Sequence, residues 1–293
     1  MNVLSLFDGI SCGRIALDRA GIKVDKYYAS EIDKYATHVS VINYPDSIRL
    51  GDINNWESWD INWSEIDLIL AGSPCQGFSF AGKQLAFDDP RSALFFRFAE
   101  ILETIKEANS NVLFLLENVK MKTQFENIIS CTLGVKPVLI NSASVSAQDR
   151  KRLYWCNWNI EQPKDKNICI GNIQHEYQIN EPVDHKYLCS IGWLKWWEEN
   201  KDYQLNKKYS WLCRRNDKAI TMTARQYASW NGNFIQLSNG SIRKLTPIEC
   251  ERLQNLPDNY TACISDAQRY KSLGNCWTVN VISHILKQSQ NHG

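Results

Sequence analysis

The sequence predicts an α/β fold with a doubly wound, mostly parallel sheet, and three observations lead to this prediction. Over the first 160 residues, short apolar runs alternate with helix-like stretches, as in chains that build parallel sheets. Glycines and polar side chains follow the apolar runs directly. From about 158 to 242 the alternation stops and polar residues dominate, which indicates a small inserted domain.

The predicted elements follow one another along the chain. Strands are predicted at 2–6, 27–30, 68–71, 112–117 and 135–141. Helices are predicted between them at 12–20, 34–42, 92–106 and 122–131. After the insert, Thr246 and Pro247 are typical of the N-cap and first position of a helix through Leu253, and a last helix is expected at about 278–288. Ligands of such sheets bind beyond the carboxyl ends of the strands, so the residues that follow each strand are candidates for a site.

Composition excludes several classes of protein. The chain is 44% hydrophobic and 22% charged with a net charge of +1, so it is neither disordered nor strongly basic. A nucleic-acid partner would have to meet a local basic face. No apolar run approaches the roughly 20 residues of a membrane span, and no signal-like segment opens the chain, so a cytoplasmic protein is expected.

The ten cysteines are irregularly spaced. No two of them form a C-x-x-C pair, and the five histidines do not lie near cysteine pairs at zinc-ligand spacing. We therefore expect neither a disulfide framework nor a metal site. Most of the thiols are expected to be small buried hydrophobic groups, and a single one is expected to be chemical.

Loops after the early strands carry features of a nucleoside site. The first strand leads into Phe7-Asp8-Gly9-Ile10-Ser11-Cys12-Gly13, where glycines let the backbone approach a ligand and a helix N-terminus offers N–H groups. Glu31 is placed to accept from ribose hydroxyls, and Asp52 from an adenine amino group. Either acid alone is equally well explained as a helix cap or a solvated charge. Together with the glycine turn they favour a nucleoside-bearing cofactor.

Two later loops carry residues suited to a reaction. The strand at 68–71 leads to Gly72-Ser73-Pro74-Cys75-Gln76, which puts a cysteine where reactants meet. The strand at 112–117 ends at Glu117, where desolvation favours a protonated carboxyl. A buried structural thiol and a helix-terminal charge are the alternatives for the two residues taken separately. Their position on neighbouring strand ends favours a nucleophile paired with a proton donor.

Taken in order, these segments resemble the motifs of DNA (cytosine-5) methyltransferases. The resemblance rests on Phe7-Asp8-Gly9 with Gly13, Glu31, Gly51-Asp52-Ile53, Gly72-Ser73-Pro74-Cys75-Gln76, Glu117-Asn118-Val119, Gln148-Asp149-Arg150-Lys151-Arg152, Arg243-Lys244-Leu245-Thr246-Pro247 and Leu273-Gly274-Asn275. It covers nearly the whole chain, and the chain is similar to compact bacterial or phage members and to the eukaryotic de novo enzymes. It implies a Rossmann-like catalytic domain at 1–157 and 243–293 and a target-recognition domain at 158–242.

The resemblance also implies a mechanism. Cys75 would add to C6 of a cytosine flipped out of the duplex, and C5 would take the methyl group of S-adenosyl-L-methionine. Glu117 would donate to N3 of the base, and Asn118 would support that geometry. Arg152 would contact O2 of the cytosine, and Arg150 would brace the Cys75 loop or a phosphate. The i, i+2 spacing of these arginines places both on one face of a strand, with simple salt bridging as the alternative.

For the cofactor, the resemblance implies that Phe7 stacks on adenine, Glu31 holds the ribose and Asp52 binds adenine N6. Ile32 or Ile53 would flank the ring. The remaining members of the implied cofactor site are Asp8, Gly9, Ile10, Gly13, Ser73, Pro74, Asn275 and Trp277.

The implied partner is double-stranded DNA. The loop at 76–91 would close over the extruded nucleotide, with expected DNA contacts at Gln76, Ser79, Lys83 and Arg91. Within the insert, the candidate DNA contacts are Arg214, Arg215, Arg225 and Gln226. Solvated loop charges are the alternative for the arginines, and Trp196 with Trp197 is expected to form the small core of the insert. We expect a monomer, with a restriction endonuclease as the further partner to consider.

Two other functions remain open at this point. One is methylation of RNA, as in the tRNA-modifying branch of the family, which usually shows Pro-Pro-Cys-Gln where this chain has Ser73 before Pro74. The other is a catalytically inactive DNA-binding relative. The presence of Cys75, Glu117 and both arginines argues against that second alternative.

Overall fold

A computed structural model of the chain describes residues 1–74, 93–174, 184–204, 210–228, 232–237 and 239–290. The chain divides into two compact units. Unit 1 comprises Met1–Ile140, Lys151–Gln162 and Val281–Gly293, and unit 2 comprises Asn141–Arg150 and Pro163–Asn280. Unit 2 thus includes the predicted insert from Pro163 onward, together with most of the chain that follows it, while residues 158–162 belong to unit 1. Target recognition by 158–242 stays a prediction.

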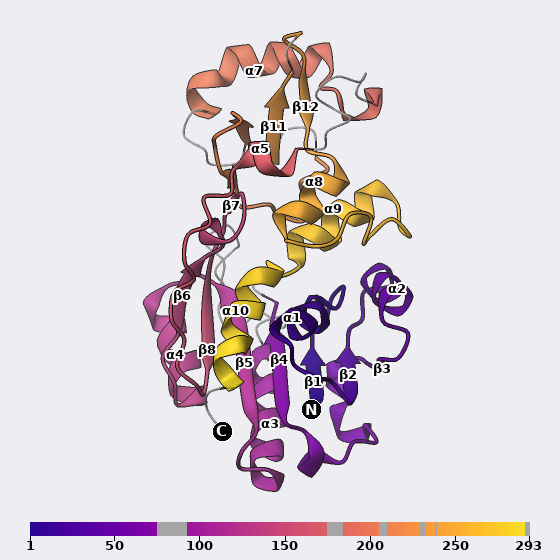
Figure 1. Ribbon diagram of the computed structural model, residues 1–293, viewed down its shortest axis with the longest axis vertical. Coiled ribbons are helices and arrows are strands. Elements are labelled where there is room, and N and C mark those ends of the chain that lie inside the picture. Colours follow the sequence, from indigo (N-terminus) through magenta and orange to yellow (C-terminus); the bar gives the residue numbers. More distant parts are fainter. Residues whose placement is uncertain (75–92, 175–183, 205–209, 229–231, 238, 291–293) are drawn as a thin grey trace. The chain divides into compact units, whose positions relative to one another are not determined.

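Unit 1 is built on a seven-stranded sheet in the order β3-β2-β1-β4-β5-β8-β6 (Figure 1). Its strands are β1 Asn2–Leu6, β2 Lys26–Ser30, β3 Ile48–Gly51, β4 Leu68–Gly72, β5 Leu113–Val119, β6 Val138–Asn141 and β8 Lys151–Cys156. The pairs from β3 to β5 are all parallel, whereas β8 runs antiparallel to β5. The predicted α/β fold with a mostly parallel sheet is confirmed.

The α-helices that accompany this sheet lie where the sequence predicts them. They are α1 Cys12–Ala20, α2 Lys34–Asn43, α3 Ala93–Ala108 and α4 Thr123–Leu133, with α10 Val279–Ser289 after the last strand. The short 3-10 helices η1 Ile53–Ser58 and η2 Trp63–Glu65 are additional to the predicted elements. Local chemistry sets their ends. The Asp33 side chain accepts the backbone N–H groups of Tyr35 and Ala36 at the start of α2. Gly134 adopts the left-handed conformation that ends α4.

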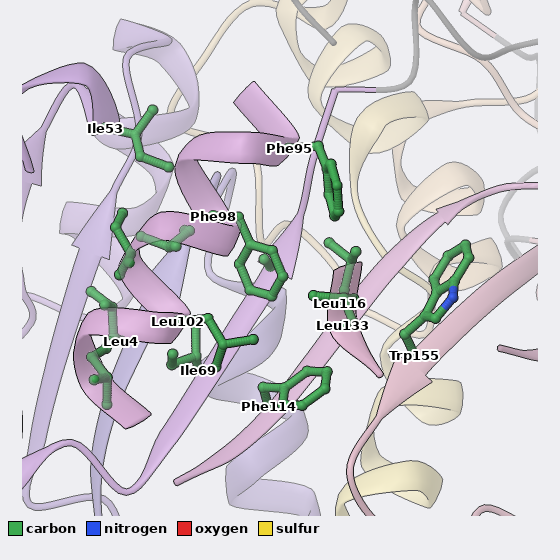
Figure 2. Close-up of a cluster of buried hydrophobic side chains, with 14 of the residues drawn as sticks. Leu4, Ile53, Ile69, Phe95, Phe98, Leu102, Phe114, Leu116, Leu133 and Trp155 are labelled. Carbon is green, nitrogen blue, oxygen red and sulfur yellow. The ribbon is translucent and has the colours of Figure 1, made fainter. Parts of the chain in front are cut away.

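The apolar core of unit 1 lies between the sheet and α3 (Figure 2). Ile69 and Phe114 from β4 and β5 pack with Phe95, Phe98 and Leu102 of α3, and all five are 1% exposed or less. Since side chains alternate along a strand, these strands bury one face here and send the intervening residues to the other face. The core fixes the strands, and with them the loops at their carboxyl ends.

Unit 2 is assembled from short strands together with both short and longer helices. These are η4 Ser142–Ser144, β7 Gln148–Asp149, α5 Ile170–Ile173, η5 His185–Tyr187, α7 Ile191–Gln204, β9 Ser210–Cys213, β10 Ala219–Ile220, β11 Gly232–Gln236, β12 Ile242–Lys244, α8 Pro247–Leu253 and α9 Asp266–Asn275. The sheets are β12-β11-β9 and β10-β7. Trp193 stacks on Trp197, with ring centroids 5.2 Å apart, in a small core with Phe234. The predicted helix after Thr246 forms, and Thr246 and Glu249 build a capping box at its start.

Candidate active site

The turn after β1 has an unusual backbone. Phe7, Gly9 and Ser11 all adopt left-handed conformations, with φ of 57°, 59° and 61°. Such values are costly for residues with a Cβ, so other contacts must hold this turn in place. A Cβ at Gly9 would meet no atom within 4 Å, which leaves open space beside the backbone where a ligand can approach. Gly13 and Ile10 are buried, so the Ile10 side chain is turned into the protein.

Glu31 stands at the end of β2 and is joined to this turn. Its Oε2 accepts the Gly9 N–H at 2.8 Å, and its Oε1 accepts the N–H groups of Ile32 and Asp33 at 2.8 and 2.7 Å. Burial raises the pKa of the Glu31 carboxyl above its ordinary value, while the backbone hydrogen bonds oppose that shift. A carboxylate offers roughly four acceptor positions, so a partly exposed Glu31 retains capacity for a ligand hydroxyl.

The residues predicted around the adenine differ in exposure. Ile32 is 73% exposed beside Glu31, whereas Ile53 is 4% exposed and belongs to the apolar core. The enclosed Ile53 side chain offers little surface to a ligand, and its contact with the ring stays a prediction. Asp52 caps η1, and its Oδ1 accepts the Asn54 backbone N–H at 2.9 Å. Phe7 packs partly against the core. An open backbone, an acidic acceptor and an exposed apolar side chain together fit an adenosyl group.

The ends of β4 and β5 form the second part of the site. Gly72 pairs with Glu117 in the parallel ladder, and the Asn118 amide donates to the Ser73 hydroxyl at 2.9 Å. Arg152 on β8 lies beside them, with its Nε 3.0 Å from Glu117 Oε1. The Glu117 and Arg152 side chains are 11% and 13% exposed, so they are largely desolvated but still reach the surface. An acid and a guanidinium are thereby held next to the segment that leads through Pro74 towards residue 75.

Arg150 does not share a strand face with Arg152, which corrects the expectation from their spacing. The chain passes from β7 to β8 at Arg150, and the two arginines belong to different units. Within unit 2, the Arg150 guanidinium donates to the carbonyls of Met222, Gly274 and Cys276 at 2.9, 3.3 and 3.1 Å. The side chain is enclosed, with the residue 4% exposed. Arg150 therefore joins the 221–224 segment to the end of α9.

The DNA-contact candidates of unit 2 separate into two groups. Arg214, Arg215 and Arg225 are exposed. Gln226 is fully buried, and its amide exchanges hydrogen bonds of 3.3 Å with the backbone of Asn233. This enclosed side chain packs unit 2 together, and the expectation that Gln226 contacts DNA is not supported by its burial.

The remaining candidates are placed as follows. Asn275, the last residue of α9, is exposed, and Trp277 is partly buried. Several predicted residues lie outside the described part of the chain, namely Cys75, Gln76, Ser79, Lys83 and Arg91.

The described cysteines include thiols unsuited to nucleophilic work. Burial raises the pKa of Cys156 and of Cys189 to about 11, and it raises the pKa of Cys250 as well. A thiol with such a pKa carries almost no thiolate at neutral pH, and the thiolate is the nucleophile.

Over the described residues, no cluster of three or more metal-ligating side chains is present. Nor does any helix in that part of the chain combine the length and apolar character that crossing a bilayer requires.

The fold and these contacts define a class of protein: an α/β protein with an open glycine turn and a firmly held carboxylate after β1 and β2, and an acid–guanidinium pair where β5 and β8 lie side by side. Comparison with known proteins agrees. The family model described as C-5 cytosine-specific DNA methylase matches residues 1–291. A type II methyltransferase of Lactococcus lactis subsp. cremoris, M1.ScrFI, is 33% identical over 98% of this chain and 77% of its own. M.NlaX of Neisseria lactamica is 31% identical over 98% and 95%.

Solved structures show the same fold. The methyltransferase EhMeth of Entamoeba histolytica matches with a TM-score of 0.74, at 17% identity over 100% of this chain and 99% of that one. The chain belongs to the C-5 cytosine-specific DNA methylase family, and it is a DNA cytosine-5 methyltransferase. Enzymes of this family generally use S-adenosyl-L-methionine as the methyl donor.

Proposed function

We propose that this enzyme methylates C5 of cytosine within a short sequence of duplex DNA, with S-adenosyl-L-methionine as donor and Cys75 as nucleophile. The pairing of Gly72 with Glu117, and the hydrogen bond from Asn118 to Ser73, carry this proposal. They fix Gly72 and Ser73, which shortly precede Cys75, against β5, the strand that carries Glu117. Pro74 then restricts the backbone between Ser73 and Cys75.

In the proposed reaction, the Cys75 thiolate forms a bond to C6 of a flipped cytosine, and the electron pair of the C5–C6 bond moves towards C5. Glu117 donates a proton to N3 and so accepts the charge that develops in the ring. Arg152 faces O2 of the base and holds the Glu117 carboxyl through its Nε. After C5 is methylated, water takes the C5 proton and the C5–C6 double bond re-forms as the S–C6 bond breaks. Cys75 leaves as a thiolate, and the N3 proton returns to Glu117.

Glu31, Gly9 and Phe7 are the residues that would hold the cofactor. Glu31 would accept from the ribose hydroxyls, Phe7 would stack on the adenine, and Asp52 would accept from its amino group. When bound, the cofactor supplies an electrophilic methyl group on a positively charged sulfur. The open space beside Gly9 and the remaining acceptor capacity of Glu31 support this assignment.

Sequence choice is proposed to belong to the region at 158–242. Exposed Arg214, Arg215 and Arg225 have the chemistry to contact guanine edges or phosphates.

The chain is further proposed to act as a monomer in the cytoplasm of a bacterial or phage-infected cell. A restriction endonuclease of the same specificity is its proposed functional counterpart, by analogy with the type II methyltransferases that it resembles.

The test is transfer of labelled methyl groups from S-adenosyl-L-methionine to duplex DNA, with tRNA as the competing substrate. We expect transfer to DNA alone, and Cys75→Ala is expected to lower the rate by at least about 10³-fold. Duplex DNA that carries 5-fluorocytosine should trap the wild-type enzyme covalently, because fluorine cannot leave C5 as a proton does. Methylation of tRNA in place of DNA, or full activity of Cys75→Ala, would contradict the proposal.

A further inference from the structure

Asp8 stands inside the turn after β1, and its carboxylate gathers an unusual number of partners. Its Oδ1 accepts the hydroxyls of Ser5 and Tyr27, each at 2.7 Å. Its Oδ2 accepts the hydroxyls of Ser11 at 2.6 Å and Ser40 at 3.4 Å. The side chain is 0% exposed. These partners come from β1, β2, α1 with its N-cap, and α2, so one carboxylate ties together four elements.

A fifth element joins through Arg49 of β3. Its Nη1 lies 3.6 Å from Asp8 Oδ2 and donates to the Ser40 hydroxyl at 2.6 Å. Its Nη2 donates to the Tyr44 carbonyl at 3.1 Å, at the end of α2. Arg49 therefore balances the buried negative charge and fastens β3 to the same cluster. We call Asp8, Ser5, Ser11, Tyr27, Ser40 and Arg49 the Asp8 cluster.

The carboxylate of Asp8 has no capacity left for a ligand. It offers roughly four acceptor positions, and four hydroxyl groups occupy them. Direct contact between this side chain and the cofactor is therefore excluded by its burial and its partners. Any influence of Asp8 on the cofactor must pass through the backbone that it holds.

The backbone of the Phe7–Ser11 turn is the part of the site that other contacts must hold in place. Phe7 and Ser11 flank Asp8 with left-handed conformations, which residues with side chains adopt only when other contacts hold them there. The Asp8 N–H donates to the Ser30 carbonyl at 3.0 Å, and the next N–H, that of Gly9, donates to Glu31. The fixed turn thus presents both the Phe7 ring and the N–H group that orients Glu31.

We propose that Asp8 is a positioning residue for cofactor binding. It sets the Phe7–Ser11 turn and, through Gly9, the carboxylate of Glu31, without touching the cofactor. This inference rests on the proposed function, because it assumes that Phe7 and Glu31 bind S-adenosyl-L-methionine. The sequence motif attributes the conformation of the Phe7–Ser11 turn to its glycines. The inference attributes it to the hydrogen bonds of the Asp8 cluster as well.

The test compares affinity for S-adenosylhomocysteine, the product that lacks the transferred methyl group, with thermal stability and steady-state kinetics. Asp8→Ala is expected to weaken binding of S-adenosylhomocysteine by about 10- to 100-fold, because it leaves four hydroxyls without this acceptor and Arg49 without its counter-charge. It should raise KM for the donor to a similar extent, with kcat at saturating donor within about 2-fold of wild type. Tyr27→Phe removes one hydroxyl at constant shape and is expected to weaken binding about 3-fold.

A matched control separates positioning from general destabilisation. Ile129→Ala removes buried apolar volume from α4 in the same unit, away from the Asp8 cluster. It should lower the melting temperature without changing the affinity of the folded enzyme for S-adenosylhomocysteine. Asp8→Asn keeps the shape and one acceptor oxygen, so it should restore affinity partly relative to Asp8→Ala.

The outcomes are distinct. Asp8 variants that melt early but bind S-adenosylhomocysteine like wild type would overturn the inference. If Asp8→Ala does not fold, Tyr27→Phe and Asp8→Asn decide, and unchanged affinity in both overturns it equally. Failure of the wild-type enzyme to bind S-adenosylhomocysteine would instead contradict the proposed function.

Discussion

Buried carboxylates are held differently in the two units. In unit 1, Glu117 has Arg152 beside it, and both side chains keep about a tenth of their surface exposed, 11% and 13%. In unit 2, Glu249 is closed in: its two oxygens accept from both Nη atoms of Arg243, each at 2.8 Å, and the two side chains are 0% and 2% exposed. Glu31 of unit 1 is intermediate, because three backbone N–H groups hold it while part of it stays accessible.

The difference indicates how a buried charge is used. A carboxylate that its partners enclose completely stabilises the fold, as Glu249 does. A carboxylate that is held firmly but still reaches the surface can exchange a proton or a hydrogen bond with a ligand. Substitution of the open carboxylates should therefore lower activity more than stability, and substitution in the closed pair should do the reverse.

Glu117→Gln should show the largest effect. It keeps the shape of the side chain but removes the proton donor, so we expect kcat for methyl transfer to fall by about 10²- to 10⁴-fold. The melting temperature and the affinity for S-adenosylhomocysteine should stay close to wild type. Single-turnover transfer to duplex DNA measures the effect. A Glu117→Gln enzyme that loses stability but keeps its rate would reverse the comparison.

Arg243→Met tests the closed pair. It leaves Glu249 buried without its guanidinium, so unit 2 should lose about 3–5 kcal/mol of stability. Urea unfolding followed by tryptophan fluorescence measures this loss. The exposed pair of Arg97 and Glu100 in unit 1 is the control, because Arg97→Met should cost no more than about 1 kcal/mol. Equal losses of stability in Arg243→Met and Arg97→Met would show that burial does not determine how much these two ion pairs contribute to stability.

Glu31→Gln should act mainly on the cofactor. An amide retains one acceptor oxygen but sets its NH2 group against a backbone N–H, so affinity for S-adenosylhomocysteine should fall by about 10- to 100-fold. Equilibrium binding measures the change. Glu65→Gln, which removes an exposed carboxylate paired with Lys26 in the same unit, should leave affinity unaltered. A similar loss in both variants would mean that net charge, and not the geometry of Glu31, sets affinity.

The regular part of unit 1 was predictable because its elements repeat a simple pattern. The strand at 2–6 and the helix at 12–20 have the predicted bounds, since apolar runs end at glycines and polar residues. β3 was not predicted, because Ile48–Gly51 is short and half polar. The antiparallel direction of β8 is set by long-range pairing with β5, which local patterns do not contain.

The site was predictable as a list of residues but not as a set of contacts. Glu31 follows β2 as expected, and Glu117 lies two residues before the carboxyl end of β5. Both were found because polar residues near strand ends lie at the edge of the sheet where ligands bind. The separation of Arg150 from Arg152 was missed, since the break between β7 and β8 interrupts the two-residue period. In the Asp8 cluster, Asp8 contacts residues up to 41 positions away, so hydroxyls such as those of Tyr27 and Ser40 gave no local signal.

The pH dependence of Glu31 separates its two roles. Burial raises the pKa of this carboxyl in the folded protein above the ordinary value of 4.5. The folded state therefore holds the proton more tightly than the unfolded chain, and the stability that Glu31 contributes is fully present below 4.5 and is lost as pH rises through the raised pKa. Cofactor affinity should change in the opposite direction, because the ionised carboxylate is the better acceptor for ribose hydroxyls.

Glu31→Gln cannot titrate, so subtracting its profiles from those of wild type isolates both effects. We expect the stability difference to decrease, and the difference in S-adenosylhomocysteine affinity to increase, across the same window above pH 4.5. Urea unfolding and equilibrium binding at a series of pH values measure the two curves. If both curves change in the same direction, Glu31 behaves as a closed carboxylate like Glu249, and its acceptor positions are not used by the cofactor.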